Sequence, residues 1–473
     1  MKPITLIALA ALVLTGSCRK IEVDGSATGG GSTTILPGGT SENLILEGRI
    51  TESRTLRAAN TYKLRGLVYV TSGAILTIEP GTKIVGELNR QGGLVITRSA
   101  KIVADGTADK PIVFTSEATN PARGDWSGVV LLGNAPTNST FNGVGGVGEV
   151  EGGVNNSDGL GLYGTPVTQA QNPVDNSGIL RYVRIEYAGY AFLPDKEING
   201  LTFGGVGSGT VVDNVQVSYA NDDSFEWFGG TVKCAHLIAY KGLDDDFDTD
   251  NGFNGKVQFG IVLRDSSVAD ISQSNGFESD NDAGGSSLTP QTAPVFSNIT
   301  SVGPRVTLTN IGNSNFRRGM HIRRNSSMSL FNSIVMGWPT GLHLDAALGT
   351  ATDLNFTAAT PRGVLANNIL AGNNTQFTYT ANVSAPTGFT LTDLVNYWNR
   401  PTGGNSVLTN TSDVMLTAPF KYDNTVDFNP AIGSPALTGA AFTDSKLSGL
   451  TTVSYRGATA AGDTWWKVWT KYM

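Results

Sequence analysis

Apolar and polar residues alternate in short runs along most of the chain, starting near residue 64. Three early segments share one pattern, in which an alternating run is followed by a turn at Gly or Ser and then by another apolar residue: LVYVTSGAIL (67–76), LTIEPGTKI (76–84) and LVITRSAKI (94–102). Alternation of period two is typical of half-buried strands, and Gly and Ser are typical of tight turns. The pattern therefore predicts short strands separated by corners.

Similar strands recur farther along the chain: RYVRIEYAG (181–189), DNVQVSYAN (213–221), AHLIAYKG (235–242) and VQFGIVLRD (257–265). A later group has an Asn near its start and a Gly after its apolar core: VFSNITSVG (295–303), LFNSIVMGW (330–338) and VLANNILAG (364–372). Asn tolerates the left-handed backbone conformation, so we expect these Asn residues at the corners of stacked coils. No amphipathic helix of any length is evident, and one continuous all-β solenoid is predicted.

An acidic stretch from Asp222 to Asp282 repeats at about the length of one solenoid turn. Phe225, Phe247 and Phe277 recur in it, each followed directly by an acidic residue. Stacking would place the three rings in the core and the acids in a ladder on the outer face. A second register is open, because the segments 250–253 and 274–277 also match; it would place Glu278 over Asn254.

The ladder supplies the candidate site residues, because alternate residues of a strand share one face. The candidate metal ligands are Asp244, Asp246, Asp248, Asp250, Glu278, Asp280 and Asp282, and the candidate ligand-binding residues are Asp222, Asp223, Glu226 and Trp227. Coils stack about 4.8 Å apart, and two carboxylates at that distance repel by roughly 1 kcal/mol in water and about 3 kcal/mol at an effective dielectric constant near 20. A partner of opposite charge is therefore expected.

Three interpretations of the ladder remain open. Ca²⁺ favours clustered carboxylates, although the spacing around Asp246, Asp248 and Asp250 excludes an EF-hand because the glycine comes too late. A salt-bridge network is the second interpretation, since NFRRGMHIRRN (315–325) supplies four arginines downstream. The third is an acidic face that binds a ligand directly.

Composition narrows the function classes. The chain has 473 residues, 59 of them Gly, with 15% charged residues and a net charge of −7, which argues against a nucleic-acid-binding role because that role needs a basic surface. Residues from about 117 to 178 interrupt the strand pattern and predict a long loop excursion. The last segment, from about 440 to 473, predicts a cap over the end coil through Trp465, Trp466 and Trp469; a carbohydrate-stacking platform is the alternative.

The N-terminus predicts export. Residues 1–17 have a basic start, an apolar run and small residues, as in a signal peptide that is too short to span a membrane. The sequence Leu14-Thr15-Gly16-Ser17-Cys18 resembles a bacterial lipobox, which implies cleavage before Cys18 and lipidation of that residue. An ordinary signal peptide is the alternative. Residues 18–43 then form a flexible tether and 44–473 a single domain, while Cys234 is expected to be a buried apolar residue.

Several segments carry a family resemblance: LTIEPGTKIVG, DKPIVFTS, DKEINGLTFGGVGSGT, YANDDSFEWFGGTV, HLIAYKGLDDDFDTD and the closing YRGA with its tryptophans. They are similar to a family of secreted or lipid-anchored proteins of Bacteroidetes, over about residues 45–473. The family looks like the right-handed parallel β-helix superfamily, which includes pectate lyases. The resemblance implies that fold and an outer-membrane lipoprotein, exposed at the cell surface beside a TonB-dependent receptor.

Two functions fit these observations. The favoured one is a non-catalytic binding protein that presents its acidic face to a glycan, a nutrient or a receptor. The alternative is a Ca²⁺-dependent polysaccharide lyase acting on acidic glycans, with Lys241, Arg264 or Arg318 as the base. The three histidines lie in strand-like segments, where burial is expected: His236, His321 and His343.

Overall fold

The computed structural model describes residues 43–193, 196–357 and 361–472. The predicted signal peptide, Cys18 and the tether up to residue 42 lie outside the described residues. The chain divides into two units at Ser41, and every strand and helix among the described residues belongs to the second unit.

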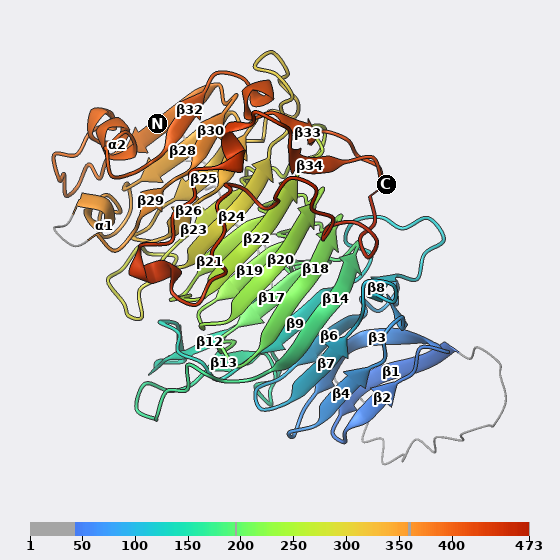
Figure 1. The fold of residues 1–473 in the computed structure, drawn as a ribbon. Helices are drawn as coiled ribbons and strands as arrows, with labels where there is room; N and C mark the ends of the chain where they lie inside the picture. Colours follow the sequence, from blue (N-terminus) through green and yellow to red (C-terminus); the bar gives the residue numbers. More distant parts are fainter. Residues whose placement is uncertain (1–42, 194–195, 358–360, 473) are drawn as a thin grey trace, which may run out of the picture. The chain divides into compact units, whose positions relative to one another are not determined.

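Backbone hydrogen bonds join most strands into one 26-stranded parallel sheet that winds as a right-handed β-helix (Figure 1). The all-β solenoid predicted from the alternation is confirmed, and so is the β-helix implied by the resemblance. Paired strands fall into three columns, each of which forms one face of the helix. The first face consists of β2 (Arg54–Leu56), β4 (Ile75–Ile78), β7 (Lys101–Asp105), the first halves of β14 (Gly178–Glu186), β18 (Val211–Ser218), β20 (Lys233–Tyr240), β22 (Lys256–Leu263) and β24 (Val295–Val302), and then β26 (Ser329–Phe331) and β29 (Leu365–Ala366).

The second and third faces complete each coil. The second face consists of the first half of β3 (Thr61–Val70), β5 (Lys83–Gly86) and β8 (Ile112–Ser116), followed by the second halves of β14, β18, β20, β22 and β24. It ends with β27 (Ile334–Met336), β30 (Ile369–Ala371) and β32 (Ser406–Leu408). The third face consists of the ends of β1 (Asn43–Ile50) and β3, β6 (Gly93–Ile96), β9 (Gly128–Leu132), β17 (Leu201–Gly204), β19 (Phe225–Phe228), β21 (Phe247–Asp250), β23 (Phe277–Ser279), β25 (Arg318–Ile322), β28 (Thr340–Asp345) and β31 (Thr375–Thr380).

The corner between the first two faces is made by single residues in the left-handed conformation. The residues with positive φ at this corner are Tyr182, Asn214, His236, Phe259, Asn298, Asn332 and Asn367. Asn is the residue that adopts this conformation most easily after Gly, and its amide can bond to neighbouring backbone groups. The expectation that the repeated Asn residues occupy corners is confirmed.

The interior of the helix is a continuous apolar core with an aromatic stack beneath the third face. Phe225, Phe247 and Phe277 are fully buried and pair in register, with ring centroids 5.7 and 5.5 Å apart along the stack. The first predicted register is therefore confirmed. The alternative, which placed Glu278 over Asn254, is wrong, because Glu278 pairs with Asp248.

Between β8 and β14 the chain first forms β9, which belongs to the third face, and then two hairpins. These are β10 (Thr140–Phe141) with β11 (Val144–Gly145), and β12 (Val147–Glu149) with β13 (Leu162–Gly164). Val154 and Tyr163 of the second hairpin pack on Val130 and Leu132 of β9. The hairpin thus covers the outer side of the third face near its start and leaves its middle to polar residues. A further hairpin joins β15 (Ala191–Leu193) to β16 (Lys196–Glu197).

The C-terminal segment runs back along the side of the β-helix (Figure 1). It contains β33 (Leu416–Ala418), β34 (Asp427–Pro430) and three short 3-10 turns, Thr411–Val414, Pro435–Leu437 and Ser445–Leu447. Trp466 and Trp469 pack on the outer side of the second face, against residues such as Ile261. The structure differs here from the predicted end cap, because the second face has an apolar outer side that must be covered along its length.

The last coil is covered by a helix that the sequence pattern did not predict. α2 (Leu391–Trp398) begins at a capping box of Thr390 and Asp393, and its Trp398 packs on Phe377 of β31 with ring centroids 5.5 Å apart. A second helix, α1 (Leu354–Thr357), is a single turn. An eight-residue helix has too few turns to show a period, so the pattern gave no signal for α2.

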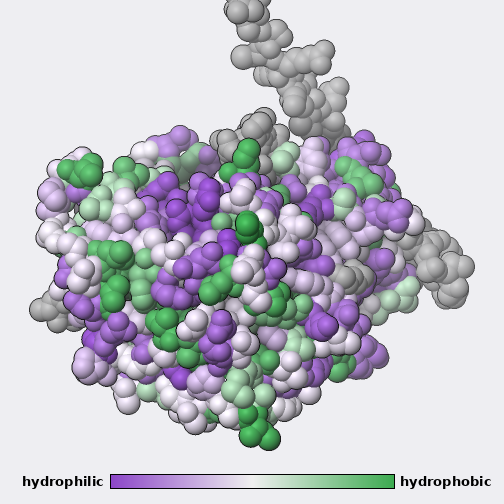
Figure 2. Space-filling model, turned by 90° about the horizontal axis from the view of Figure 1, so that it is seen from above, coloured by the Kyte–Doolittle hydropathy of each residue, from purple (hydrophilic) through white to green (hydrophobic). Residues whose placement is uncertain are grey.

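No helix among the described residues is long and apolar enough to cross a membrane. On the face drawn in Figure 2, apolar residues occur in small groups among polar ones. Large exposed side chains such as Ile271 and Val383 are scattered over separate loops. Single exposed apolar residues of this kind are normal on protein surfaces.

Candidate functional site

The middle of the third face carries a row of carboxylates on its outer side. Glu226, Asp248 and Glu278 pair in register on β19, β21 and β23, while the phenylalanine before each of them points into the core. We call the following residues the acidic row: Asp222, Asp223, Glu226, Asp244, Asp245, Asp248 and Glu278. Three triplets of the row bring one oxygen each to within 4.8 Å of one another: Asp222–Asp223–Asp244, Asp223–Glu226–Asp248 and Asp245–Asp248–Glu278.

A second ladder lies at the turn that leads into these strands. The carboxylate of Asp223 accepts the backbone N–H of Asp245 at 2.8 Å, and the carboxylate of Asp245 accepts the backbone N–H of Asn275. Asp223, Asp245 and Asn275 are at most 7% exposed, so the ladder is an internal part of the coil edge. Asp245 and Asn275 were not among the predicted site residues, although Asp245 aligns with Asp223 in the register that aligns the phenylalanines.

Two predicted site residues point into the protein instead of outward. Asp246 is fully buried and forms an ion pair of 3.0 Å with Arg264, which is also fully buried. Its position precedes the first residue of β21, so the alternation of the strand does not yet apply. Trp227 is fully buried as well, and its ring stacks on Phe203 with centroids 5.5 Å apart. The expectation that these two side chains lie on the outer face is therefore wrong.

The remaining predicted ligands occupy different positions along the face. Asp244 is half-buried and accepts a hydrogen bond of 2.6 Å from the Ser272 hydroxyl. Asp250 pairs in register with Phe228 at the end of β21. Asp282 accepts the backbone N–H groups of Gly284 and Ser286 and closes a local turn. Asp282 is thus engaged by its own loop.

The three candidate bases are dispersed. Arg264 lies inside the helix beneath the coil edge, with its guanidinium over the ring of Phe316, and is inaccessible to substrate. Lys241 follows β20 and lies among tyrosine rings, including Tyr219 and Tyr422. Arg318 begins β25 on the third face and donates a hydrogen bond of 3.2 Å to Gln273. Arg318 is the one of these three that shares a face with Glu278.

The upstream carboxylates of the row are strongly perturbed. Burial, reinforced by the charges of neighbouring acids, raises the pKa of Asp223, Glu226, Asp244 and Asp248 well above the usual value of a carboxyl group. Burial likewise raises the pKa of Asp245 to about 7. Asp248 Oδ1 and Asn275 Oδ1 are buried oxygens without a hydrogen-bond partner. Such groups are costly to bury unless a cation or a proton compensates them.

The downstream end of the row is neutralised by basic residues. Arg323 contacts the carboxylates of Glu278 and Asp280, and Arg324 lies 3.1 Å from Asp280. Burial acts to raise the pKa of Glu278, but the hydrogen bond from His321 and the charge of Arg323 outweigh burial and lower that pKa. The predicted salt-bridge network therefore exists at Glu278 and Asp280, and none of its ion pairs among the described residues includes Asp248.

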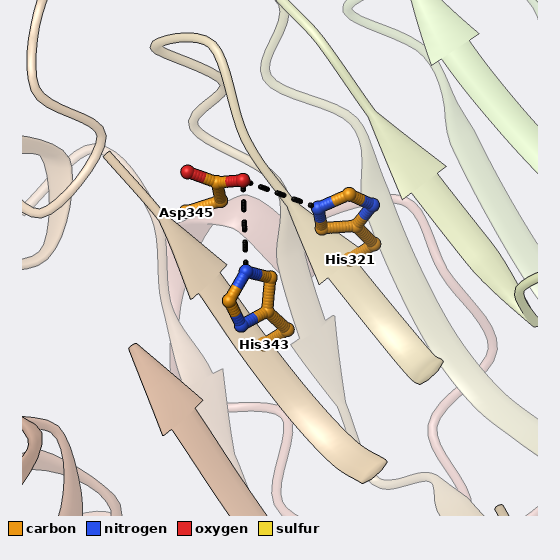
Figure 3. Close-up of side chains that lie close together, drawn as sticks. All are labelled: His321, His343 and Asp345. Atoms are coloured by element: carbon orange, nitrogen blue, oxygen red, sulfur yellow. Dashed lines mark ion pairs between the residues drawn. The ribbon is translucent and has the colours of Figure 1, made fainter. Parts of the chain in front are cut away.

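Beyond Glu278 the same outer column contains two histidines (Figure 3). His321 on β25 pairs in register with His343 on β28, and Asp345 lies on the same side two positions later. Both rings lie 3.6 Å from Asp345 Oδ2, measured at Nε2. The burial expected for these two histidines from their strand-like sequence is confirmed. Their proximity could have been predicted from their separation in the sequence, which equals that between Phe225 and Phe247.

Comparison with known proteins places the whole arrangement on a recognised scaffold. A protein-family model described as a pectate-lyase like beta helix domain matches residues 48–400. No curated protein and no solved structure matches the chain. The matched range includes the acidic row, the two histidines and Asp345.

Proposed function

The chain belongs to the pectate-lyase-like β-helix domain family, and we propose that it is a lipid-anchored, calcium-dependent binding protein for an acidic polysaccharide. The family takes its name from an enzyme of such a polysaccharide, pectate. The acidic row is the binding surface in this proposal, and the glycan lies along the outer side of the third face. Extended faces of solenoids are suited to long, regular ligands.

One observation carries the proposal. Within the described part of the chain, Asp223, Glu226, Asp244, Asp245 and Asp248 form no ion pair with Lys, Arg or His. The next acid of the row, Glu278, has such partners. These five neighbouring acids, buried or half-buried and without an ion pair to a described residue, point to a cation from solution.

The residues of the row fit Ca²⁺. This ion takes six to eight oxygen ligands, mostly from carboxylates and amide carbonyls. Asp223, Glu226, Asp248 and Asp245 would supply the carboxylates, and the unpartnered Asn275 Oδ1 would supply an amide oxygen. Bound Ca²⁺ would neutralise the row and accept further oxygens from a uronate carboxylate.

The requirement for calcium follows from charge. An acidic glycan is repelled by a row of carboxylates unless cations lie between them. Asp222, Asp244 and Asp248 are half-buried, so the row is accessible to ions and to a glycan from solvent. The lipobox-like segment ending at Cys18 and the Gly- and Ser-rich tether support anchoring at the outer membrane, with the binding face held away from it. A TonB-dependent receptor is the partner expected from the Bacteroidetes resemblance.

Calorimetry with Ca²⁺, followed by titration of polygalacturonate in Ca²⁺ and in chelator, tests this function. We expect saturable Ca²⁺ binding, and glycan binding only when Ca²⁺ is present. At free Ca²⁺ of 100 times the dissociation constant, the protein should gain about 2.7 kcal/mol of unfolding free energy.

Asp248→Asn should abolish the Ca²⁺ effects, because Asp248 belongs to two of the three triplets. The matched control is Asp105→Asn, which removes a carboxylate of the first face that pairs with Arg181. Equal unfolding midpoints in Ca²⁺ and in chelator would remove calcium from the proposal. Ca²⁺ binding without glycan binding would reject the polysaccharide and keep the ion.

The lyase is a second candidate because of Arg318. Its guanidinium lies on the third face with the acidic row. Burial lowers the pKa of Arg318, as a base requires, although the charge of Glu278 acts to raise that pKa. An unsaturated, ultraviolet-absorbing product from polygalacturonate, lost in Arg318→Ala and kept in Arg317→Ala, would establish this reaction. Arg317 is the matched control because it is exposed and its guanidinium donates a hydrogen bond to the Ser314 carbonyl, away from the acidic row.

A further inference from the structure

Three electron-pair donors converge on one point of the third face, apart from the acidic row (Figure 3). They come from His321, His343 and Asp345, each of which offers one ligand atom within 4.8 Å of the other two, and both Nε2 atoms lie 3.6 Å from Asp345 Oδ2. The strand register creates this arrangement, since β25 and β28 are adjacent and place His321 beside His343. Asp345 follows His343 by two positions and therefore lies on the same side of β28.

The ring of His321 is fixed in one orientation. Its Nδ1 lies 2.9 Å from Glu278 Oε2, and a carboxylate at that distance accepts a hydrogen, so Nδ1 carries the proton. The Nε2 atom is then the ring nitrogen that can bind a metal ion, and it faces the Asp345 carboxylate. This Nε2 is buried and has no hydrogen-bond partner. A buried ring nitrogen that faces a carboxylate without a hydrogen bond has room for a metal ion between the two atoms.

The other two donors are oriented in the same way. His343 Nδ1 lies 2.7 Å from the Thr378 hydroxyl on β31, which leaves Nε2 directed to Asp345. Asp345 Oδ1 accepts the backbone N–H of Ala347 at 2.9 Å, which leaves Oδ2 directed to the rings. Each donor is thus held through its other polar atom, the arrangement that fixes ligands in metal sites.

The distances favour a metal over a hydrogen bond. The two N···O separations of 3.6 Å are too long for hydrogen bonds. Two ligands bonded at 2.0–2.2 Å to one tetrahedral ion lie about 3.3–3.6 Å apart. His343 Nε2 also lies 3.3 Å from the Thr380 hydroxyl, and a metal ion bound at this nitrogen would replace that hydrogen bond.

We propose that His321, His343 and Asp345 bind a divalent transition-metal ion of the Zn²⁺ class. Two imidazoles and one carboxylate suit Zn²⁺, Co²⁺, Fe²⁺ and Mn²⁺ and are a poor match for Ca²⁺, which prefers oxygen ligands. The histidine side chains are 4% and 8% exposed, and that of Asp345 is 24% exposed. The site therefore opens on the Asp345 side, where at least one coordination position remains for water or for an oxygen of a ligand.

The site is independent of the proposed calcium row in composition and is linked to it by one residue. Glu278 lies at the end of the acidic row and also orients His321. Arg318 is the nearby positive charge that opposes a cation here, and its hydrogen bond to Gln273 holds part of the guanidinium. The carboxylates of Glu278 and Asp345 offset that charge.

Cobalt provides the test, because Co²⁺ in a site of low coordination number absorbs visible light. The chelator-treated, purified full-length chain is titrated with Co²⁺ in the presence of excess Ca²⁺, which occupies the acidic row, and Zn²⁺ is then added. We expect one equivalent of Co²⁺ to produce the visible band and one equivalent of Zn²⁺ to remove it. Asp345→Asn and His343→Ala should each weaken Co²⁺ binding by at least about 100-fold, and Thr378→Val by about 10-fold.

His236→Ala is the matched control. His236 is also a strand histidine with a carboxylate partner, Asp213, but it lies on another face. Co²⁺ binding kept in His236→Ala and lost in Asp345→Asn supports the proposal, with folding of each variant verified by circular dichroism. Asp345 is partly exposed, so that variant remains informative if His343→Ala does not fold. Absence of saturable Co²⁺ binding, or binding kept in Asp345→Asn, would overturn the proposal. The Asp248→Asn variant, which should no longer bind Ca²⁺, should still give the Co²⁺ band.

Discussion

The carboxylate of Glu278 accepts a hydrogen bond of 2.9 Å from His321 Nδ1, across two adjacent coils of the β-helix. This bond joins the proposed calcium row to the proposed transition-metal site. It also marks the boundary between the carboxylates of Glu278 and Asp280, which have basic partners, and those of Glu226 and Asp248, which form no ion pair with a described residue.

Arg323→Gln should destabilise the protein by roughly 2 kcal/mol, because Glu278 and Asp280 would then be buried with fewer compensating charges. Chemical denaturation measures the change. Arg317→Gln, which removes an exposed arginine of the same cluster, should change the unfolding free energy by no more than about 0.5 kcal/mol. Equal effects of the two substitutions would show that the ion pairs at Glu278 and Asp280 contribute nothing specific.

In chelator, the unfolding free energy should rise as the pH is lowered from 8 to 6. Burial raises the pKa of Asp245 to about 7 and that of Asp280 to about 6, so the folded state holds protons that the unfolded state releases. Because the folded state loses these protons as the pH rises, the unfolding free energy falls, and Asp245 alone accounts for about 1.4 kcal/mol over this interval. Denaturation at both pH values measures it, and Asp245→Asn should reduce the slope. A protein that is more stable at pH 8 would contradict the expectation.

Trp466→Ala should cost about 3–5 kcal/mol, because the side chain is fully buried on the outer side of the second face. Thermal unfolding would reveal the loss. The control is Val468→Ala in the same segment, where the side chain is 79% exposed and the expected effect is within about 0.5 kcal/mol. A small effect at Trp466 would mean that the tail adds little to the stability of the second face.

Cys18→Ser should abolish incorporation of labelled palmitate and release the chain from the membrane fraction when it is produced in a bacterium that lipidates exported proteins. The reason is that the thiol and the new amino terminus carry the acyl chains. Ser17→Ala keeps a small residue before Cys18 and should leave labelling intact. Labelling that persists in Cys18→Ser would reject the lipobox.

The sequence predicted those parts of the structure in which one residue type repeats. The spacing of Phe225, Phe247 and Phe277 predicted the core stack and, with it, the register of the acidic row. The repeated Asn residues predicted a corner. In each case the physical requirement, an apolar interior or a left-handed backbone, restricts the residue type and so leaves a pattern in the chain.

Other parts left no such pattern. Strand alternation predicts Asp246 on the outer side of the coil. The prediction fails because Asp246 lies in the turn before β21, where side chains do not alternate between the two sides. Trp227 shares the parity of Phe225 and so belongs inside, which the alternation itself already required. His321 and His343 come together only once the coil length is known, and the third donor, Asp345, is recognisable only beside them.

The returning C-terminal segment changes how the coils depend on one another. Backbone carbonyls between residues 441 and 471 accept hydrogen bonds from Asn332, Asn298 and Gln258, which belong to three successive levels of the helix, and from Gln216, which lies nearer its start. In a plain solenoid each coil contacts only its neighbours, and unfolding can begin at either end. Here a segment that follows the coils in the chain is bonded to coils that were synthesised much earlier. A chain truncated or cleaved before residue 441 would keep its coils and lose these hydrogen bonds. An intact returning segment is therefore needed for the β-helix to unfold as one cooperative unit.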